Sequence, residues 1–225
     1  MHRLDWKTGL PLNFGNTGTP PMALNRALPQ EPLRGEFEAF IQHRFRKAYN
    51  ASVHQFMPEL FGLSDGSGTL CAVAGVRAAA SGSLFLERYL DEPIERIVEA
   101  TAGTPVGRQS IVEVGNLAAS SMGSARLSII TITWLLAKGG LEWVAFTGNA
   151  GLVNSFTRLG LRPVTLCPAD PLRLGEDRYT WGTYYDTQPS VHVGDIRSGF
   201  LHLSNTGLFE RFGLTVELEQ SCHVA

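Results

Sequence analysis

The chain has 225 residues, of which 44% are hydrophobic and 18% are charged, so it can bury a substantial core and does not belong to the disordered class. Its formal net charge of −2 offers no electrostatic footprint for nucleic acid or for an anionic membrane. No apolar run approaches the roughly 20 residues of a membrane span, and the first residues carry charge and proline where a signal peptide is apolar. We therefore expect a cytoplasmic protein without an integral membrane segment.

The three cysteines, Cys71, Cys167 and Cys222, are too few and too scattered for a disulfide framework, and none has the spacing of a zinc motif. His54 and His192 also lack metal-like spacing, so we expect them to be structural. The sequence thus predicts no metal site.

The first half of the chain begins with residues 1–33, which are rich in Gly, Pro, Asn and Thr and lack hydrophobic periodicity. We expect a loosely ordered N-terminal arm there. Apolar residues at helical spacing predict a helix over residues 35–49. Residues 59–65 and 69–79 have the pattern of a β-hairpin joined by Gly66-Ser67-Gly68. Residues 83–103 predict a short apolar piece followed by a helix.

The second half of the chain alternates strands and helices. The spacing predicts strands over residues 109–119, 141–148, 161–167 and 181–196, the last one broken at Pro189, and helices over residues 124–138 and 149–160. Residues 198–225 predict a small helix and one last strand.

This order of elements indicates an α/β protein of the α+β type, with a mixed central sheet flanked by helices. We place this domain at residues 34–200, with a C-terminal extension at residues 201–225.

The strand over residues 109–119 meets the next helix in a turn of small residues, Ser120-Ser121-Met122-Gly123-Ser124-Ala125. The N–H groups at a helix start have no partner within the helix and carry partial positive charge, so they suit a phosphate. Gly123 lets a ligand approach the backbone, and the serine hydroxyls add donors. The same pattern is typical of a simple N-cap, and the turn alone does not decide between the two.

The order of strand, small-residue loop, helix and strand resembles the GNAT acyltransferase fold. The resemblance implies that residues 120–125 take the place of the loop that binds the acyl-CoA pyrophosphate, with Gly123 and Ala125 matching and Ser120 replacing a basic or amide residue. Residues 149–160, with Asn149 and Asn154, resemble the segment that holds the pantetheine arm. Because the basic or amide residue is replaced, an acyl carrier protein is an alternative donor to acyl-CoA.

Longer phrases of residues 36–200, among them FIQHRFRKAYNASVHQFMPEL, IVEVGNLA and WGTYYDTQPSVHVGDI, resemble the thermostable hemolysin family. Sequences of that family are similar to the GNAT-like acyl-homoserine lactone (autoinducer) synthases. The resemblance implies that Arg77 and Glu113 flank an acyl-transfer site and that Asn116 stands where the synthases have an arginine. A homoserine lactone product is not supported, so the acceptor is expected to be another small-molecule amine.

Acyl transfer from a thioester to an amine needs a base for the ammonium proton and hydrogen-bond donors for the oxyanion. Glu113, between apolar neighbours, is the candidate base because burial raises a carboxyl pKa. The N–H groups around Leu117 and Ala118 are candidate oxyanion donors, and Tyr184 or Tyr185 is a candidate proton source for the leaving thiolate.

Structural roles for the same residues stay open. Glu113 and Arg77 form an ion pair across the sheet in the simplest alternative, and Asn116 satisfies backbone groups at a bulge. Tyr184 and Tyr185 alternate along a predicted strand, so one of them faces the core. Phe85 and Leu86 pack in the core or line a fatty chain.

We therefore expect an N-acyltransferase that moves an acyl group, fatty by preference, from acyl-CoA or acyl carrier protein directly to an amine, with no metal. One alternative is a membrane-active haemolysin, although the sequence has no export signal and no basic amphipathic helix. Another is a non-catalytic acyl-binding domain that keeps the fold.

Overall fold

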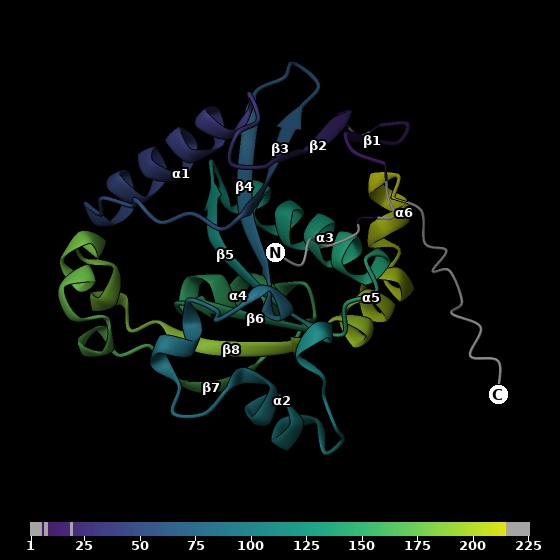
Figure 1. Cartoon of the computed structure of the whole chain (residues 1–225). Helices are drawn as coiled ribbons and strands as arrows, with labels where there is room; N and C mark the ends of the chain where they lie inside the picture. The colour runs from purple at the N-terminus through teal and green to yellow at the C-terminus, as the bar shows by residue number, and fades with distance from the viewer. Residues whose placement is uncertain (1–5, 7–8, 19, 215–225) are drawn as a thin grey trace.

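The computed structural model describes residues 6, 9–18 and 20–214. Eight strands form one sheet in the order β1-β2-β3-β4-β5-β6-β8-β7 (Figure 1). The strands are β1 Leu12–Phe14, β2 Met22–Ala27, β3 Glu59–Asp65, β4 Leu70–Ala78, β5 Ile111–Ala119, β6 Trp143–Gly148, β7 Val164–Pro168 and β8 Ser190–Asp195. The β5–β6 pair is parallel and every other pair is antiparallel. The predicted mixed sheet flanked by helices is confirmed.

Helices cover both faces of the sheet (Figure 1). They are α1 Arg34–Tyr49, α2 Ile94–Ala102, α3 Met122–Lys138, α4 Ala150–Arg158, α5 Ile196–Asn205 and α6 Leu208–Phe212, with a short 3₁₀ helix, η2, over Leu86–Tyr89. Side chains of β5 alternate between the faces: Val112 packs in the core beneath α3, α5 and α6, whereas Ile111 packs beneath α2 and η2. A third core cluster lies beneath α1. The apolar residues at strand and helix spacing therefore form hydrophobic cores on both faces of the sheet.

The N-terminal segment is a correction to our expectation of a loose arm, as far as its residues are described. Strands β1 and β2 extend the sheet beyond β3, and Leu24 pairs with Leu63. Leu24 is buried in the main core. The strands are short and lie next to glycines and prolines, so they carry too little alternation to be read from the sequence.

The segment before β8 is a second correction. The strand expected over residues 181–196 begins only at Ser190, and 3₁₀ turns occupy Pro171–Trp181 and Tyr184–Thr187. The chain turns at Gly182, whose φ is 53° and whose Cβ position would meet the Tyr49 carbonyl at 2.1 Å. Close packing on the end of α1 thus replaces extended pairing here.

The C-terminal boundary predicted at residue 200 falls inside α5 (Ile196–Asn205). The predicted small helix is present, but the last strand would lie at residues 215–225, outside the described part of the chain. Over the described residues, no helix is long and apolar enough to cross a membrane.

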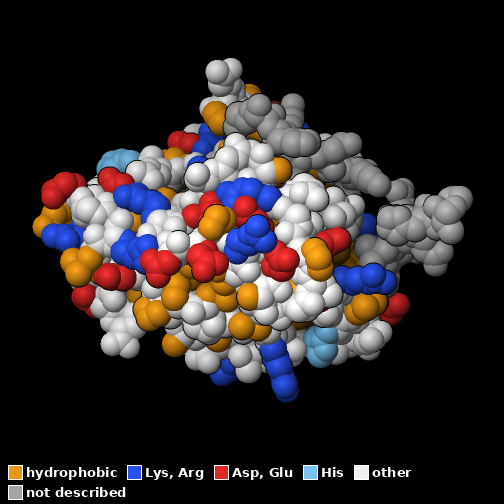
Figure 2. Space-filling view, turned by 60° about the horizontal axis from the view of Figure 1, so that its bottom comes forward, with side chains coloured by type: hydrophobic (Ala, Val, Ile, Leu, Met, Phe, Trp, Pro, Cys, Tyr) orange, Lys and Arg blue, Asp and Glu red, His pale blue; other side chains and the backbone are white. Residues whose placement is uncertain are grey.

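The face that carries α2 and β7 mixes acidic and basic side chains without a block of one sign (Figure 2). Ion pairs account for part of this mixture, among them Arg88–Asp177 at 2.7 Å and Arg173–Asp91 at 2.8 Å. This surface is consistent with the small net charge of the chain.

Candidate active site

The central opening of the fold lies between β5 and β6. These parallel strands pair only at Ile111, Val112 and Glu113, and from Val114 onward β5 separates from β6. On its other side β5 contains a bulge, because Asn116 and Leu117 together face the single residue Ala74 of β4. A bulge bends its strand and increases the local twist, so it accounts for the separation that opens the sheet here.

Asn116 stabilises the bulge. Its φ is 50°, a left-handed conformation that asparagine tolerates better than most residues. Its side-chain Oδ1 accepts from Met57 N at 2.8 Å, and its Nδ2 donates to Gln55 O at 3.2 Å. The structure thus gives Asn116 the backbone-satisfying role considered as an alternative, fixing the segment that leads into β3.

Replacing Asn116 with alanine is expected to lower the free energy of unfolding by about 2–3 kcal/mol, because a buried N–H loses its acceptor and alanine is strained at positive φ. Urea denaturation measures the change. Asn116→Asp, which keeps an acceptor for Met57 N, is the matched control and should lose less. An Asn116→Ala midpoint equal to that of the unchanged protein contradicts this role.

A cavity of about 800 Å³ passes through the sheet at this opening. Side chains from both faces line it, including Tyr49, Arg77 and Glu113 on the α1 side and Ile129, Ile132 and Leu161 on the α3 side. Most of the lining is apolar. A cavity of this size and character is typical of a small-molecule site.

Glu113 is the buried carboxylate of this cavity, with an exposed fraction of 3%. Its two oxygens accept from Phe85 N at 2.8 Å and Leu86 N at 3.0 Å. Burial raises the pKa of Glu113 to about 7, against the opposing effect of these two hydrogen bonds and of Arg77. A carboxyl with such a pKa exchanges a proton readily near neutral pH, as a general base must.

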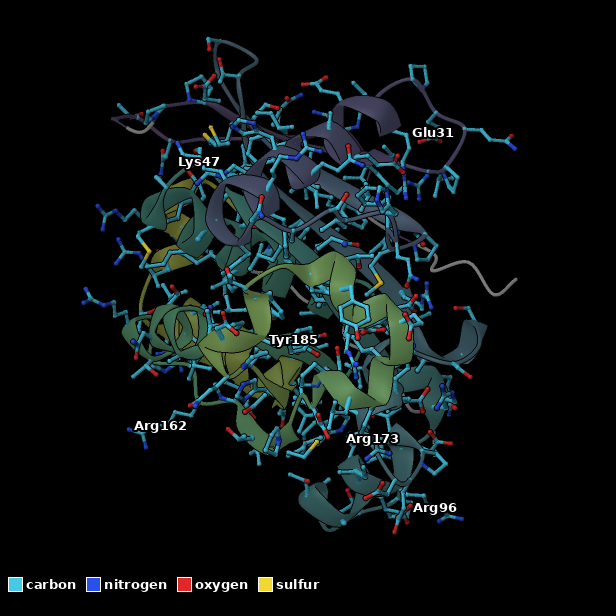
Figure 3. All side chains as sticks on the ribbon, turned by 90° about the vertical axis from the view of Figure 1, so that its left-hand side faces the viewer. Glu31, Lys47, Arg96, Arg162, Arg173 and Tyr185 are labelled. Carbon is cyan, nitrogen blue, oxygen red and sulfur yellow. The ribbon has the colours of Figure 1, made fainter. Side chains whose placement is uncertain are left out.

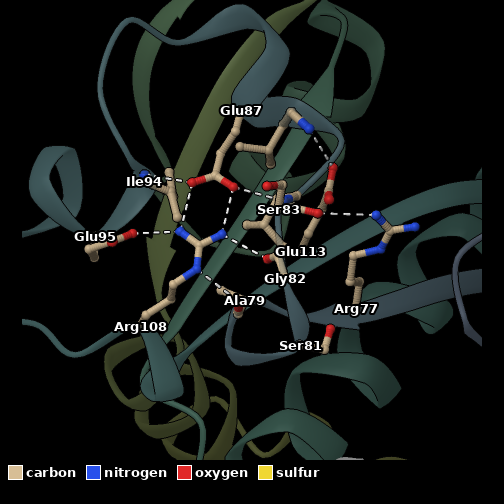
Figure 4. Close-up of polar contacts among 12 residues, drawn as sticks. Arg77, Ala79, Ser81, Gly82, Ser83, Glu87, Ile94, Glu95, Arg108 and Glu113 are labelled. Carbon is tan, nitrogen blue, oxygen red and sulfur yellow. Dashed lines mark hydrogen bonds and ion pairs between the residues drawn. The ribbon is translucent and has the colours of Figure 1, made fainter. Parts of the chain in front are cut away.

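Arg77 lies directly opposite Glu113 in the β4–β5 register, but the two groups do not form an ion pair among the described contacts. Arg77 Nη1 donates to Ser83 O at 3.2 Å instead (Figure 4). Arg77 and Glu113 are therefore opposite each other in the sheet, as the alternative expected, but their side chains do not bond to each other. Each side chain bonds instead to the backbone of residues 83–86.

The segment over Glu113 is held by Arg108, which sequence reasoning missed (Figure 4). Arg108 bonds both oxygens of Glu87 at 2.6–2.7 Å, one oxygen of Glu95 at 2.6 Å, and the carbonyls of Ala79 and Gly82 at 2.8 Å. Glu87 also accepts from Leu84 N at 2.7 Å. Burial is the largest influence on Glu87 and opposes its ionisation, but the hydrogen bonds and charge of Arg108 and the backbone N–H groups of Ile94 and Leu84 together lower its pKa.

Aromatic side chains wall the cavity next to Glu113. Tyr184 contacts Tyr49 edge-on with ring centroids 5.2 Å apart, and Tyr185, seen near the centre of Figure 3, bonds Tyr89 Oη at 2.5 Å. Both Tyr184 and Tyr185 line the cavity, and Tyr185 also packs against the core cluster beneath α2 and η2, so one of the two contacts the core as expected. Burial raises the pKa of Tyr184 and brings that of Tyr185 to about 12, so both stay protonated and able to donate.

The turn at residues 120–125 begins α3 with an N-cap: Ser121 Oγ accepts from Ser124 N at 3.1 Å. Arg44 of α1 reaches this turn and donates to Ser120 O at 3.4 Å. Met122 and Ala125 line the cavity. The N-cap interpretation is confirmed, and anion binding at Ser120, Ser121, Gly123 and Ser124 stays a prediction, with Arg44 as a cation that the sequence did not reveal.

A family model described as "Thermostable hemolysin" matches residues 27–200. The chain belongs to the thermostable hemolysin family. None of the curated proteins compared with it matches.

Solved structures with the same fold are distant in sequence from this chain. FeeM, an N-acyl amino acid synthase from uncultured soil microbes, has a TM-score of 0.56 at 13% identity, over 85% of this chain and 100% of FeeM. The AHL synthase LasI has a TM-score of 0.55 at 11% identity, over 88% of this chain and 98% of LasI. The CoA-dependent acyl-homoserine lactone synthase MesI has a TM-score of 0.51 at 11% identity, over 87% of this chain and 97% of MesI.

The remaining predicted site residues of the chain divide between the cavity and the surface. Leu117, Ala118 and Asn149 line the cavity, and Asn149 also caps α4 by accepting from Leu152 N. Asn154 is exposed on α4, and Ser155 lines the cavity instead. Successive side chains of a helix point about 100° apart around its axis, so Asn154 and Ser155 face different surroundings.

Two further expectations concern the core and metals. Phe85 lines the cavity, whereas Leu86 is fully buried in the core beneath α2. His192 is buried and contacts Thr165 Oγ1 at 3.1 Å, a structural role. Within the described residues, no three His, Cys, Asp or Glu side chains come together as metal ligands.

Proposed function

We propose that this protein is an N-acyltransferase that moves an acyl group, fatty by preference, from an acyl thioester to a small-molecule amine. The observation that carries the proposal is a buried carboxylate, Glu113, with a pKa near neutrality, in a largely apolar cavity at the opening of the sheet. The shared fold with LasI, MesI and FeeM supports it.

In the proposed reaction, the donor thioester lies along the separated part of β5. Its phosphate binds the start of α3 and Arg44, and its acyl chain extends toward Ile129 and Ile132 on the other side of the sheet. Backbone N–H groups around Leu117 and Ala118, beyond the end of the β5–β6 ladder, stabilise the oxyanion.

Glu113 takes a proton from the acceptor ammonium, and the free amine attacks the thioester carbonyl carbon. The C–N bond forms as the C–S bond breaks. The second amine proton leaves with the thiolate sulfur, through Tyr184 as donor. Acyl thioester and ammonium thus become amide, thiol and one released proton. No enzyme-bound acyl intermediate is formed.

Thiol release tests the proposal. The protein is incubated with acyl-CoA or with acyl carrier protein thioesters of several chain lengths and a panel of amines, and a thiol reagent follows the reaction. Amine-dependent release from one donor class identifies that class. Tight donor binding without release supports a non-catalytic acyl-binding domain, and neither binding nor release refutes the proposal.

A negative charge introduced at the turn of residues 120–125 tests donor binding independently of the catalytic base. Gly123→Asp is expected to raise KM for the donor about tenfold with little change in kcat, because a carboxylate at the helix start repels phosphate. The new Cβ meets only Ser121 Oγ, at 3.6 Å, so the fold should tolerate it. Gly35→Asp, which adds the same charge in α1 with no atom within 4 Å of its Cβ, is the control. Equal KM values for both variants contradict phosphate binding at this turn.

A further inference from the structure

We infer that the acceptor carries a carboxylate, which Arg77 binds, so that the substrate amine is an amino acid. The inference rests on the proposed N-acyl transfer and names the acceptor class for the same site.

Among the described contacts, Arg77 forms no ion pair or hydrogen bond with a protein carboxylate, although its charge acts on the neighbouring Glu113. Its hydrogen bond goes to a neutral carbonyl, Ser83 O. The carboxylates among the described lining residues are Glu113 and Asp195. Glu113 is held by two backbone amides, and Asp195 caps α5 through Ser198 N and Oγ. Because only Nη1 of Arg77 is used among the described hydrogen bonds, its other N–H groups are available to bind an anion in this largely apolar cavity.

The anion site at Arg77 is far from the proposed phosphate site at the turn of residues 120–125. Arg77 pairs with Glu113 across the β4–β5 ladder, and the Cα atoms of such antiparallel partners lie about 5 Å apart. The turn that starts α3 lies seven residues further along β5 from Glu113, which is roughly 20 Å of extended chain. Arg44 is the cation at that end. A donor with its phosphate at the turn therefore leaves Arg77 free at the reacting end.

The molecule at the reacting end is the acceptor. An ammonium at Glu113 and a carboxylate at Arg77 are the two charges of an amino acid, and the opposed side chains receive both at once. The walls beside them are aromatic, with Phe85, Trp181 and Tyr184 lining the cavity. They favour an amino acid with an apolar or aromatic side chain.

Matched acceptors test the inference. With one acyl-thioester donor, kcat/KM is measured for phenylalanine and for phenethylamine, which lacks only the carboxylate. The unchanged protein is expected to prefer phenylalanine by about 10- to 100-fold, the usual loss when a charge-assisted hydrogen bond is removed. Arg77→Met should abolish this preference by lowering kcat/KM for phenylalanine alone. Arg96→Met, on the exposed side of α2, should leave both values unchanged.

A binding measurement keeps the test independent of turnover. Calorimetry compares N-decanoylphenylalanine with N-decanoylphenethylamine, and only the former should bind about tenfold or more weakly to Arg77→Met. Arg77→Lys, which keeps the charge, should recover part of the binding, and circular dichroism checks that each variant is folded.

Equal affinities of the unchanged protein for the two amides overturn the inference, as does an equal loss for both in Arg77→Met. Thiol release with phenethylamine as good as with phenylalanine overturns it while the proposed function stands. No thiol release with any amine refutes the proposed function, and the binding comparison then decides on Arg77 alone.

Discussion

Glu113→Gln is expected to lower kcat/KM for amine acylation by about 10²- to 10³-fold, the usual contribution of a positioned general base. Glutamine has nearly the same shape and keeps an acceptor for one of the two amides, Phe85 N and Leu86 N. The loss should therefore fall on kcat rather than on folding. Amine-dependent thiol release measures it, with Glu99→Gln on the surface of α2 as the matched control.

The dependence of the acyl-transfer rate on pH should reflect the ionisation of Glu113. Because burial raises the pKa of Glu113 to about 7, the rate should rise as pH increases through 7 and level off above it, when the carboxylate is free to accept a proton. The residual rate of Glu113→Gln should lack this rise. A variant that keeps both the rate and the rise shows that Glu113 is only a structural cap for the 83–86 segment.

The same pKa shift links stability to pH. The folded-state pKa of Glu113, about 7, lies above its ordinary value of 4.5, so the folded protein binds a proton more tightly than the unfolded chain. This stabilisation is complete below pH 4.5 and is lost as pH rises toward 7, by about 3 kcal/mol. Urea denaturation at several pH values should show this decline in the unchanged protein and not in Glu113→Gln.

Arg108→Gln is expected to lower the free energy of unfolding by about 2–3 kcal/mol. Removing the guanidinium leaves two carbonyls without a donor and leaves Glu87 with only the backbone amides of Leu84 and Ile94. A largely buried carboxylate without its cation is costly. The partial exposure of Arg108, 26% of its side chain, reduces this cost. Urea denaturation measures it, and Arg96→Gln, an exposed pair with Glu99 at 3.3 Å, should change stability by less than about 0.5 kcal/mol.

Arg108 should also affect the base, as a positioning residue. Arg108 and Glu87 fix the segment whose amides at Phe85 and Leu86 bond Glu113, and loss of those bonds raises a carboxyl pKa. The rise of rate with pH should therefore move to higher pH in Arg108→Gln and return toward its original place in Arg108→Lys. An unmoved profile together with lower stability would mean that Arg108 supports the fold alone.

The fold was predictable from the sequence wherever periodicity is strong. The hairpin of β3 and β4, the strand β5 and the helix α3 all have clear spacing. Glu113 and Tyr184, which the sequence suggested as catalytic residues, line the cavity, and their catalytic roles stay predictions. The bulge at Asn116 was only one of several alternatives, because it depends on how β4 pairs with β5. Arg108 gave no signal, since its partners at Glu87 and Ala79 lie 21 and 29 residues away.

The early end of the β5–β6 ladder has a mechanical consequence. Strands β1–β5 and strands β6–β8 are consecutive stretches of the chain, and the sheet joins them through the pairs of Ile111, Val112 and Glu113 alone. Helix α3 links the two stretches and packs against both, reaching β4 on one side and α5 on the other. Because so few strand pairs join the two stretches, the packing of α3 against both of them sets the width of the cavity between them.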